Sequence, residues 1–232
     1  MCLSFNPFVY IWGNYKKMRF KGAIFDLDGT LIDSIEDIAD SMNSVLRENG
    51  FPEHDLKSYK IFVGNGIKTL VRRALPKDSA EEAIERCYTA MMSRYERFCD
   101  VKSAPYKGIP ELLSHFHDRG VQMAVLSNKA DRITKRVIAT LLPGTPFVNV
   151  EGLTDEATKK PNPANALKIC DNMGVRPEEI IYLGDTGIDM ETAKRAGFYA
   201  VGVLWGFRGK DELISNGADI LITAPDELLK LL

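Results

Sequence analysis

The sequence predicts an α/β protein in which a parallel sheet is flanked by helices and an all-helical module follows the first strand. Three observations support this prediction. Residues 23–25 form a short apolar run typical of a buried strand, residues 34–105 show helical patterns without a clear strand, and helices alternate with apolar strands from residue 106 onward. Because so short a first strand would not be stable elsewhere, we expect it to join the later strands in one sheet.

The helical module is predicted to begin at Ser34, a plausible N-cap, and its first helix should end near Gly50. Apolar residues at helical spacing indicate two further helices, around residues 67–75 and 83–95. A turn-forming segment at residues 105–108 would then return the chain to the sheet. The predicted domains are an N-terminal extension at 1–17, a core at 18–33 and 106–232, and a helical cap at 34–105.

The rest of the core is predicted from the alternation of helical and strand patterns. Such alternation is typical of parallel strands that lie side by side with helices covering them. The predicted helices are 109–119, 131–142, 162–173, 188–196 and 225–231, and the predicted strands are 121–126, 180–184, 199–203 and 219–222.

The composition is that of an ordinary folded domain. The chain has 232 residues, of which 45% are hydrophobic and 27% charged, and its formal net charge is −2. There is no overall basic field that would attract nucleic acid or an anionic membrane, so we expect neither as a partner. The four cysteines show no CxxC spacing, which argues against a zinc site and a disulfide framework. A cytoplasmic protein with reduced thiols is expected.

The N-terminal extension contains an apolar run at residues 8–12. This run is too short to span a bilayer and lacks a preceding basic region, so neither a membrane span nor a signal peptide fits it. It is interpreted either as residues upstream of an alternative start at Met18 or as an arm that packs on the domain or on a second subunit. A monomer and a homodimer are both compatible with the sequence.

Two carboxylates stand one residue apart at the end of the first strand, in the sequence DLDGTL at residues 26–31. The carboxyl ends of strands are where open α/β sheets bind their ligands. Because side chains at positions i and i+2 of a strand point the same way, Asp26 and Asp28 can face one site, while Gly29 permits a tight turn. The pattern suggests phosphoryl transfer, although short acidic turns after strands are also common.

Two later strand or helix boundaries carry groups that suit a phosphate. Ser127 and Asn128 follow the predicted strand at 121–126, where a hydroxyl can donate to a phosphate oxygen. Lys160 precedes Pro161 and a new helix, and lysine is a natural point charge for phosphate. Taken alone, the first pair also fits an ordinary turn and the lysine also fits a solvated basic loop.

The strand predicted at 180–184 repeats the arrangement of the first, because Asp185 and Asp189 follow it. Acids at positions i and i+4 share one face of a helix, and few carboxylates with open water positions suit Mg²⁺. Asp185 could instead simply cap the next helix. Four such polar segments at strand ends in one α/β chain nevertheless favour a functional site over four unrelated turns and caps.

In these motifs the chain resembles the haloacid dehalogenase-like hydrolases, and within them the phosphoglycolate phosphatase-like members. The resemblance covers nearly everything from Met18 onward and implies a Rossmann-like core with a helical cap inserted after the first strand. The matching motifs occur in the family's order: residues 26–31, Ser127-Asn128-Lys129, Lys160-Pro161, and Gly184-Asp185 with Asp189.

The resemblance also implies residue roles in an Mg²⁺-dependent reaction. Asp26 would be the nucleophile that forms an aspartyl-phosphate, and Asp28 would be the general acid and base. Asp28 separates this chain from the family's dehalogenases, which attack carbon and do not need that acid. The implied Mg²⁺ ligands are the Asp26 carboxylate, the Asp28 backbone carbonyl, Asp185 and Asp189. The implied phosphate-binding residues are Gly29, Thr30, Ser127, Asn128 and Lys160.

Residues of the cap would contact the substrate. The run Gly64-Asn65-Gly66 and the helix after it look like the cap loop of phosphoglycolate phosphatases, and residues 205–208 look like their late core loop. Gly64, Asn65 and Arg72 are therefore candidate substrate contacts, with Arg73 as an alternative to Arg72. An ordinary glycine turn and solvated helix charges would give the same pattern.

The function expected from the residues and the resemblance is hydrolysis of a small phosphorylated metabolite, with 2-phosphoglycolate as the first candidate. A β-phosphoglucomutase-like phosphotransferase or a pyrophosphatase would use the same core motifs. A non-catalytic metabolite-binding protein is the alternative of another class, and it is disfavoured because every motif acid and the motif lysine are present.

Overall fold

The protein is built around a six-stranded parallel sheet with the strand order β5-β4-β1-β6-β7-β8. A computed structural model describes residues 20–230, so the predicted N-terminal extension lies outside the described residues. The strands are β1 (Gly22–Phe25), β4 (Gln122–Ala130), β5 (Phe147–Leu153), β6 (Ile180–Gly184), β7 (Tyr199–Val203) and β8 (Ile220–Ile222). The predicted α/β class with a parallel sheet is thus confirmed, and the short first strand lies at the sheet centre.

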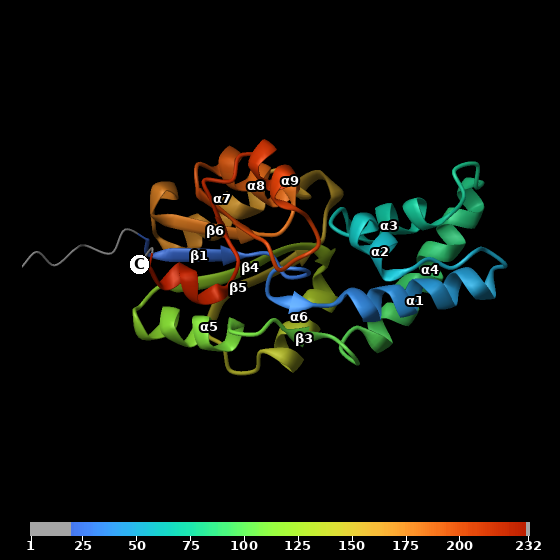
Figure 1. Ribbon diagram of the computed structural model, residues 1–232, viewed down its shortest axis with the longest axis horizontal. Helices are drawn as coiled ribbons and strands as arrows, with labels where there is room; N and C mark the ends of the chain where they lie inside the picture. The colour runs from blue at the N-terminus through green and yellow to red at the C-terminus, as the bar shows by residue number, and fades with distance from the viewer. Residues whose placement is uncertain (1–19, 231–232) are drawn as a thin grey trace, which may run out of the picture.

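Helices cover both faces of this sheet (Figure 1). On one face lie α7 (Ala164–Met173), α8 (Gly187–Ala196) and α9 (Lys210–Ser215), and on the other lie α5 (Ile109–Asp118) and α6 (Asp131–Leu141). Successive residues of β1 pack on opposite faces of the sheet. Ile24 packs in the core formed with α7 and α8, and Phe25 packs in the core formed with α5. Burial on both faces explains why the central strands read as continuous apolar runs.

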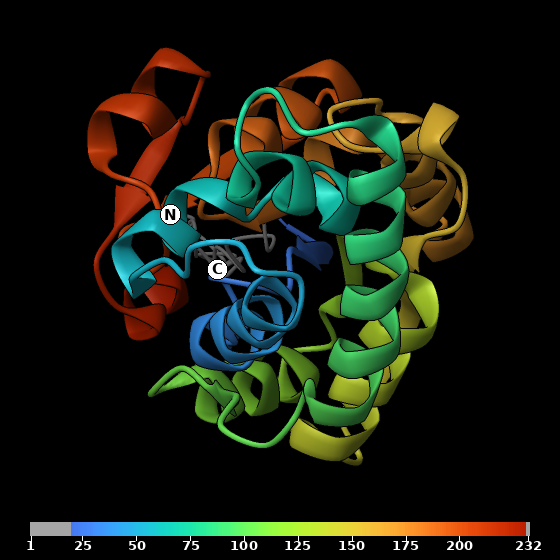
Figure 2. The same ribbon diagram turned by 90° about the vertical axis from the view of Figure 1, so that its right-hand side faces the viewer.

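Four helices form an insertion between the core strands, set beside the sheet in Figure 1 and facing the viewer in Figure 2. They are α1 (Ile35–Glu48), α2 (Leu56–Phe62), α3 (Gly66–Ala74) and α4 (Glu81–Phe98), and we call them the helical insertion. The chain enters through β2 (Ile32–Asp33) and leaves through β3 (Ala104–Pro105), which pair antiparallel. The two connections to the core therefore lie side by side.

The return segment after α4 is held by a buried carboxylate of α1. Asp37 accepts hydrogen bonds from the backbone N–H of Lys102 at 3.0 Å and of Ser103 at 2.8 Å, and from the Ser103 hydroxyl at 2.6 Å. These bonds give partners to polar groups of the segment that follows α4, which would otherwise be unpaired. Asp37 thus stabilises the chain reversal without taking part in the acidic cluster described below.

Several elements differ from the sequence-based prediction. The strand predicted at 121–126 continues to Ala130 across an irregularity in its pairing with β5, so Ser127 and Asn128 lie within β4 and not after it. β5 was missed because Asn149 and Glu151 interrupt its apolar residues, as befits a half-exposed edge strand. The short helices α2 and α9 were also missed, and residues 225–230 form a 3₁₀ helix. Within residues 20–230, every helix is too short or too polar to cross a bilayer.

Candidate active site

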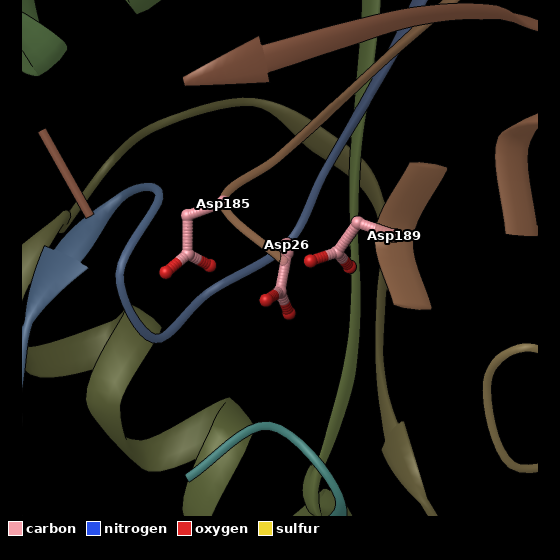
Figure 3. Close-up of side chains that lie close together, drawn as sticks. All are labelled: Asp26, Asp185 and Asp189. Carbon is pink, nitrogen blue, oxygen red and sulfur yellow. The ribbon is translucent and has the colours of Figure 1, made fainter. Parts of the chain in front are cut away.

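Three buried carboxylates meet at the carboxyl edge of the sheet. Asp26 follows β1, Asp185 follows β6 and Asp189 lies in the first turn of α8, and one oxygen of each falls within 4.8 Å of the others. Figure 3 shows the three side chains around a common space, with Asp26 between the other two. The parallel pairing of β1 with β6 brings together residues that are far apart in the sequence.

Lys160 supplies the positive charge inside this cluster. Its Nζ forms a salt bridge with Asp26 Oδ1 at 2.8 Å, and it donates to Asp189 Oδ1 at 2.7 Å and to the carbonyl oxygen of Leu126 at 3.1 Å. The ammonium group is thus held between two carboxylates and a backbone carbonyl. Neighbouring Lys159 instead pairs with Glu156, so Lys160 and not Lys159 is the lysine that the fold brings to the acids.

One lysine does not neutralise three acids, and the pKa values reflect this imbalance. Burial and then the Asp189 charge raise the pKa of Asp26 to about 7, against the lowering effect of Lys160. Burial, followed by the charges of Asp189 and Asp26, also raises the pKa of Asp185 well above its ordinary value. Burial lowers the pKa of Lys160, but the Asp189 and Asp26 charges outweigh it and leave that pKa well above the usual range. The cluster therefore favours binding of either protons or a further cation.

The donor set fits a divalent cation. Asp185 Oδ2 accepts from the Phe207 N–H at 2.7 Å, but Asp185 Oδ1 is buried and has no hydrogen-bond partner among the described residues. Asp189 Oδ2 is already held by the N–H and hydroxyl of Thr186, at 3.1 and 2.6 Å. Carboxylate oxygens are the hard donors that Mg²⁺ accepts, a few at a time beside water, and one of them here is buried without a partner among the described residues.

Two glycines allow the backbone to approach Asp185. A Cβ on Gly29 would lie 2.2 Å from Asp185 Oδ2, and Gly29 has a φ of 86°, a left-handed conformation that favours glycine. A Cβ on Gly206 would lie 2.3 Å from Asp185 Cβ and 2.4 Å from the Gly29 carbonyl oxygen. The loop after β1 and the loop after β7 therefore enclose Asp185 only because both positions lack a side chain.

Asp28 lies beside the acidic cluster but has its own partners. Its Oδ1 accepts from the Ser34 hydroxyl at 2.6 Å and from Lys129 Nζ at 2.7 Å. Lys129 Nζ also donates to the hydroxyl of Tyr95 in α4. Sequence reasoning gave no role to Lys129 or Tyr95, although Lys129 directly follows Ser127 and Asn128, and that adjacency was the available signal.

The other predicted phosphate-binding residues are near the site but largely engaged with the protein. The backbone N–H of Gly29 donates to the carbonyl of Ile32 at 2.9 Å, and that of Thr30 donates to the carbonyl of Leu27 at 3.3 Å, so both amides stabilise the turn. Ser127 lies at the site with its hydroxyl accepting from the Lys129 N–H at 3.2 Å.

Asn128 ties three segments together. Its Nδ2 donates to the carbonyls of Gly64 at 3.1 Å and Lys160 at 3.2 Å, while its Oδ1 accepts from the Lys160 N–H at 2.9 Å. With all of these bonds made to backbone, the side chain fixes the position of Lys160 and of the loop after α2.

A pocket opens above Asp26 and Asp28, between the sheet edge and the helical insertion. Ser127, Asn128 and Lys129 line it from the core, and the insertion contributes Ile38, Val63, Gly64, Gly66, Ile67, Leu70, Met91 and Tyr95. Of the predicted cap contacts, Gly64 is therefore at the pocket. Asn65 is the N-cap residue of α3 and makes no side-chain capping bond, and Arg72 is exposed and paired with Glu81. The structure does not bring Arg72 to the pocket.

Comparison with known proteins agrees with this geometry. Residues 23–203 match the model of a family described as haloacid dehalogenase-like hydrolase. The chain belongs to the haloacid dehalogenase-like hydrolase family. It is 33% identical over 209 residues to a phosphoglycolate phosphatase of Aquifex aeolicus, a match that covers 90% of this chain and 95% of that protein. These relationships make it a phosphoglycolate phosphatase-like hydrolase.

Two further members of the family are informative. An N-acetylmuramic acid 6-phosphate phosphatase of Pseudomonas aeruginosa is 30% identical over 219 residues, which span 94% of this chain and 96% of that enzyme. A crystal structure from Lactobacillus delbrueckii subsp. bulgaricus, provisionally described as a phosphoglycolate phosphatase, superimposes with a TM-score of 0.86 at 27% identity, covering 91% of this chain and 97% of that one. The Rossmann-like core and its helical insertion are thus shared with solved structures.

Proposed function

We propose that this hydrolase is an Mg²⁺-dependent phosphatase of small phosphomonoesters that works through an aspartyl-phosphate on Asp26, with 2-phosphoglycolate as the leading substrate. The observation that carries the proposal is the arrangement of Asp26, bonded to Lys160 and next to Asp28, on the floor of a pocket. A nucleophile, a cation and a second carboxyl group within one site are the parts that phosphoryl transfer requires.

In the first step, an Asp26 carboxylate oxygen attacks phosphorus and the bond from phosphorus to the ester oxygen breaks. Asp28 gives its proton to the departing alkoxide, which leaves as an alcohol. Lys160 fixes the Asp26 carboxylate through the 2.8 Å contact, so that the nucleophile is oriented before substrate arrives.

In the second step, water attacks the phosphorus of the aspartyl-phosphate and the bond to Asp26 breaks. Asp28, now a carboxylate, accepts a proton from that water, so that free phosphate is released and both acids return to their starting states. Splitting the hydrolysis in this way replaces one difficult step by two easier ones.

Mg²⁺ would be held by Asp26, Asp185 and Asp189, and when bound it would offset the repulsion between the anionic nucleophile and the anionic phosphate. The unsatisfied Oδ1 of Asp185 supports this assignment. The Asp28 backbone carbonyl is the fourth protein ligand that we propose, on the basis of the family resemblance.

The helical insertion would act as a cap that closes over the pocket and excludes water. Its loop after α2 is already tied to the core at Asn128, and Arg208 of the core donates to the carbonyls of Ile61 at 3.1 Å and Val63 at 2.9 Å. These bonds support a closed arrangement of the insertion over Asp26 and Asp28.

A phosphotransferase is the second candidate, because it would use the same core motifs. Such an enzyme must keep water away from the aspartyl-phosphate, and the cap determines whether water reaches it. A structure from Bacteroides vulgatus, provisionally described as a β-phosphoglucomutase, has a TM-score of 0.70 at 21% identity, which shows the shared fold alone. Hydrolysis is favoured by the more similar relatives, which are phosphatases.

The test is phosphate release from a panel of small phosphomonoesters and pyrophosphate, with Mg²⁺ or with a chelator, for wild type beside Asp26→Asn. We expect release that needs both Mg²⁺ and Asp26, with one ester preferred. No release from any compound, together with conversion of a sugar phosphate into its isomer, would replace the phosphatase by a mutase.

A further inference from the structure

Lys129 is a buried cation for which the proposed reaction has so far found no use. It lies in β4 with its side chain only 2% exposed, and it reaches Asp28 on one side and Tyr95 of the helical insertion on the other. A buried ammonium group is costly unless it is paired, and one carboxylate already pairs with it here. Because Lys129 also lines the pocket, its ammonium group can meet a bound substrate.

Lys129 and Tyr95 each retain a hydrogen-bond donor. The ammonium group has three N–H donors, of which one goes to Asp28 Oδ1 at 2.7 Å and one to the Tyr95 hydroxyl. Burial raises the pKa of Tyr95 well above its ordinary value, so this hydroxyl keeps its proton, and that proton has no acceptor among the described residues. Two donors beside one positive charge are suited to an anion.

The rest of the pocket wall on this side is apolar. Ile67, Leu70 and Met91 of the insertion line it, and among the described residues Lys129 is the one cationic side chain that does so. An uncharged polyol would leave its hydroxyls without partners against such a wall, which is costly. A short group that carries one negative charge matches the wall better.

We infer that Lys129, with Tyr95, determines the specificity of this enzyme by binding a carboxylate on the part of the substrate that leaves. The inference rests on the proposed function, in which Asp28 protonates the leaving oxygen. Lys129 contacts the Asp28 carboxyl group, and in the proposed reaction the leaving oxygen would contact it too, so a group bound to Lys129 would lie close to the scissile bond. A carboxylate one carbon away from the ester oxygen meets this requirement, as in 2-phosphoglycolate.

The inference is tested by comparing two esters of similar size, 2-phosphoglycolate and the uncharged-tail ester 2-hydroxyethyl phosphate. For wild type we expect kcat/KM to favour the carboxylate by about 10- to 100-fold, as a charge-assisted hydrogen bond provides. In Lys129→Met this ratio should fall to about 1, because a methionine of similar length keeps the packing but removes the charge. Lys135→Met, which removes an exposed lysine of α6, is the matched control and should keep the wild-type ratio.

The outcomes separate the inference from the proposed function. If Lys129→Met lowers kcat/KM for both esters by the same factor, Lys129 only orders Asp28 and the inference is overturned. A wild type that hydrolyses both esters equally well overturns it too, while the proposed phosphatase stands. Failure of wild type to release phosphate from either ester, or from the wider panel, removes the proposed function and the inference with it.

A second variant keeps the test informative should Lys129→Met fail to fold. Tyr95→Phe retains the ring 4.6 Å from Lys129 Nζ and removes only the hydroxyl. We expect the preference for 2-phosphoglycolate to fall several-fold and the thermal midpoint to change little. An unchanged preference in folded Tyr95→Phe, as judged by circular dichroism, would contradict the role of this pair.

Discussion

The side-chain amide of Asn128 in β4 donates to the carbonyl oxygen of Gly64 at 3.1 Å, which joins the sheet edge to the loop that opens α3. The same amide group holds the backbone of Lys160 from both sides. One asparagine therefore sets the position of the lysine in the acidic cluster and the position of the proposed cap.

We expect Asn128→Ala to lower kcat/KM by about 10- to 100-fold, because misplacement of Lys160 or of the loop after α2 would disturb the alignment of Asp26, the proposed nucleophile. Asn172→Ala, at an exposed position of α7, is the matched control. Steady-state kinetics and thermal unfolding of both variants would check this prediction. Full activity of a folded Asn128→Ala would show that the contacts to Gly64 and Lys160 are dispensable.

Asp26→Asn is expected to abolish turnover, because the neutral amide cannot attack phosphorus. The same change removes one of three crowded acids, so in the presence of a chelator this variant should unfold at the same temperature as wild type or higher. Asp33→Asn, an exposed acid of β2, is the control and should leave both properties unchanged. Residual turnover above about one thousandth of wild type would exclude Asp26 as the nucleophile.

The stability of the protein should depend on pH in the absence of metal. The pKa of Asp26 is raised from 3.8 to about 7 in the folded protein, so the folded state holds a proton there that the unfolded chain has released. The raised pKa of Asp26 therefore contributes about 1–4 kcal/mol to the free energy of unfolding. This contribution is fully present below about pH 4 and is lost as the pH rises through about 7.

Mg²⁺ should reverse that trend, because it binds the ionised carboxylates and stabilises only the folded state. In a chelator we expect the thermal midpoint to fall between pH 5 and pH 7.5, and the gain on adding Mg²⁺ to be larger at the higher pH. Differential scanning calorimetry of wild type and Asp26→Asn would measure both trends. An Mg²⁺ effect of equal size at both pH values would argue against the acidic cluster as the metal site.

Gly206→Ala should weaken Mg²⁺ binding, because the new Cβ would lie 2.3 Å from Asp185 Cβ and must displace either that side chain or the loop. Gly209→Ala lies in the same loop and meets no atom within 4 Å, which makes it a close control. We expect the Mg²⁺ concentration for half-maximal activity to rise at least tenfold in Gly206→Ala and to stay constant in Gly209→Ala. Equal behaviour of the two variants would mean that Asp185 tolerates displacement.

The acids of the site could be found in the sequence because each follows an apolar strand whose pattern is local. Asp26 and Asp185 are separated widely along the chain, yet the rule that parallel strands share one carboxyl edge was enough to place them together. The edge strand β5 escaped notice because its half-exposed face carries Asn149 and Glu151.

The walls of the pocket could not be predicted in the same way. Whether Tyr95 meets Lys129 depends on how α4 packs over the sheet edge, and no local pattern encodes that crossing. Arg72 illustrates the same limit, since local pattern placed this cation on a cap helix but did not predict that it pairs with Glu81 at the surface and away from the pocket. Candidate site residues at the ends of strands could be predicted from the sequence. Those that come together only where the helical insertion contacts the core could not.

The central position of β1 has a consequence for synthesis of the protein. This strand emerges first from the ribosome, but its two neighbours, β4 and β6, are made roughly one hundred and one hundred and sixty residues later. Asp26, the proposed nucleophile, is therefore translated early and stays without Lys160 and its partner acids until most of the chain has appeared. A nascent chain that ends before α8 would carry the DLDGTL segment without Asp189, so under the proposed function we expect activity only after translation has passed that residue.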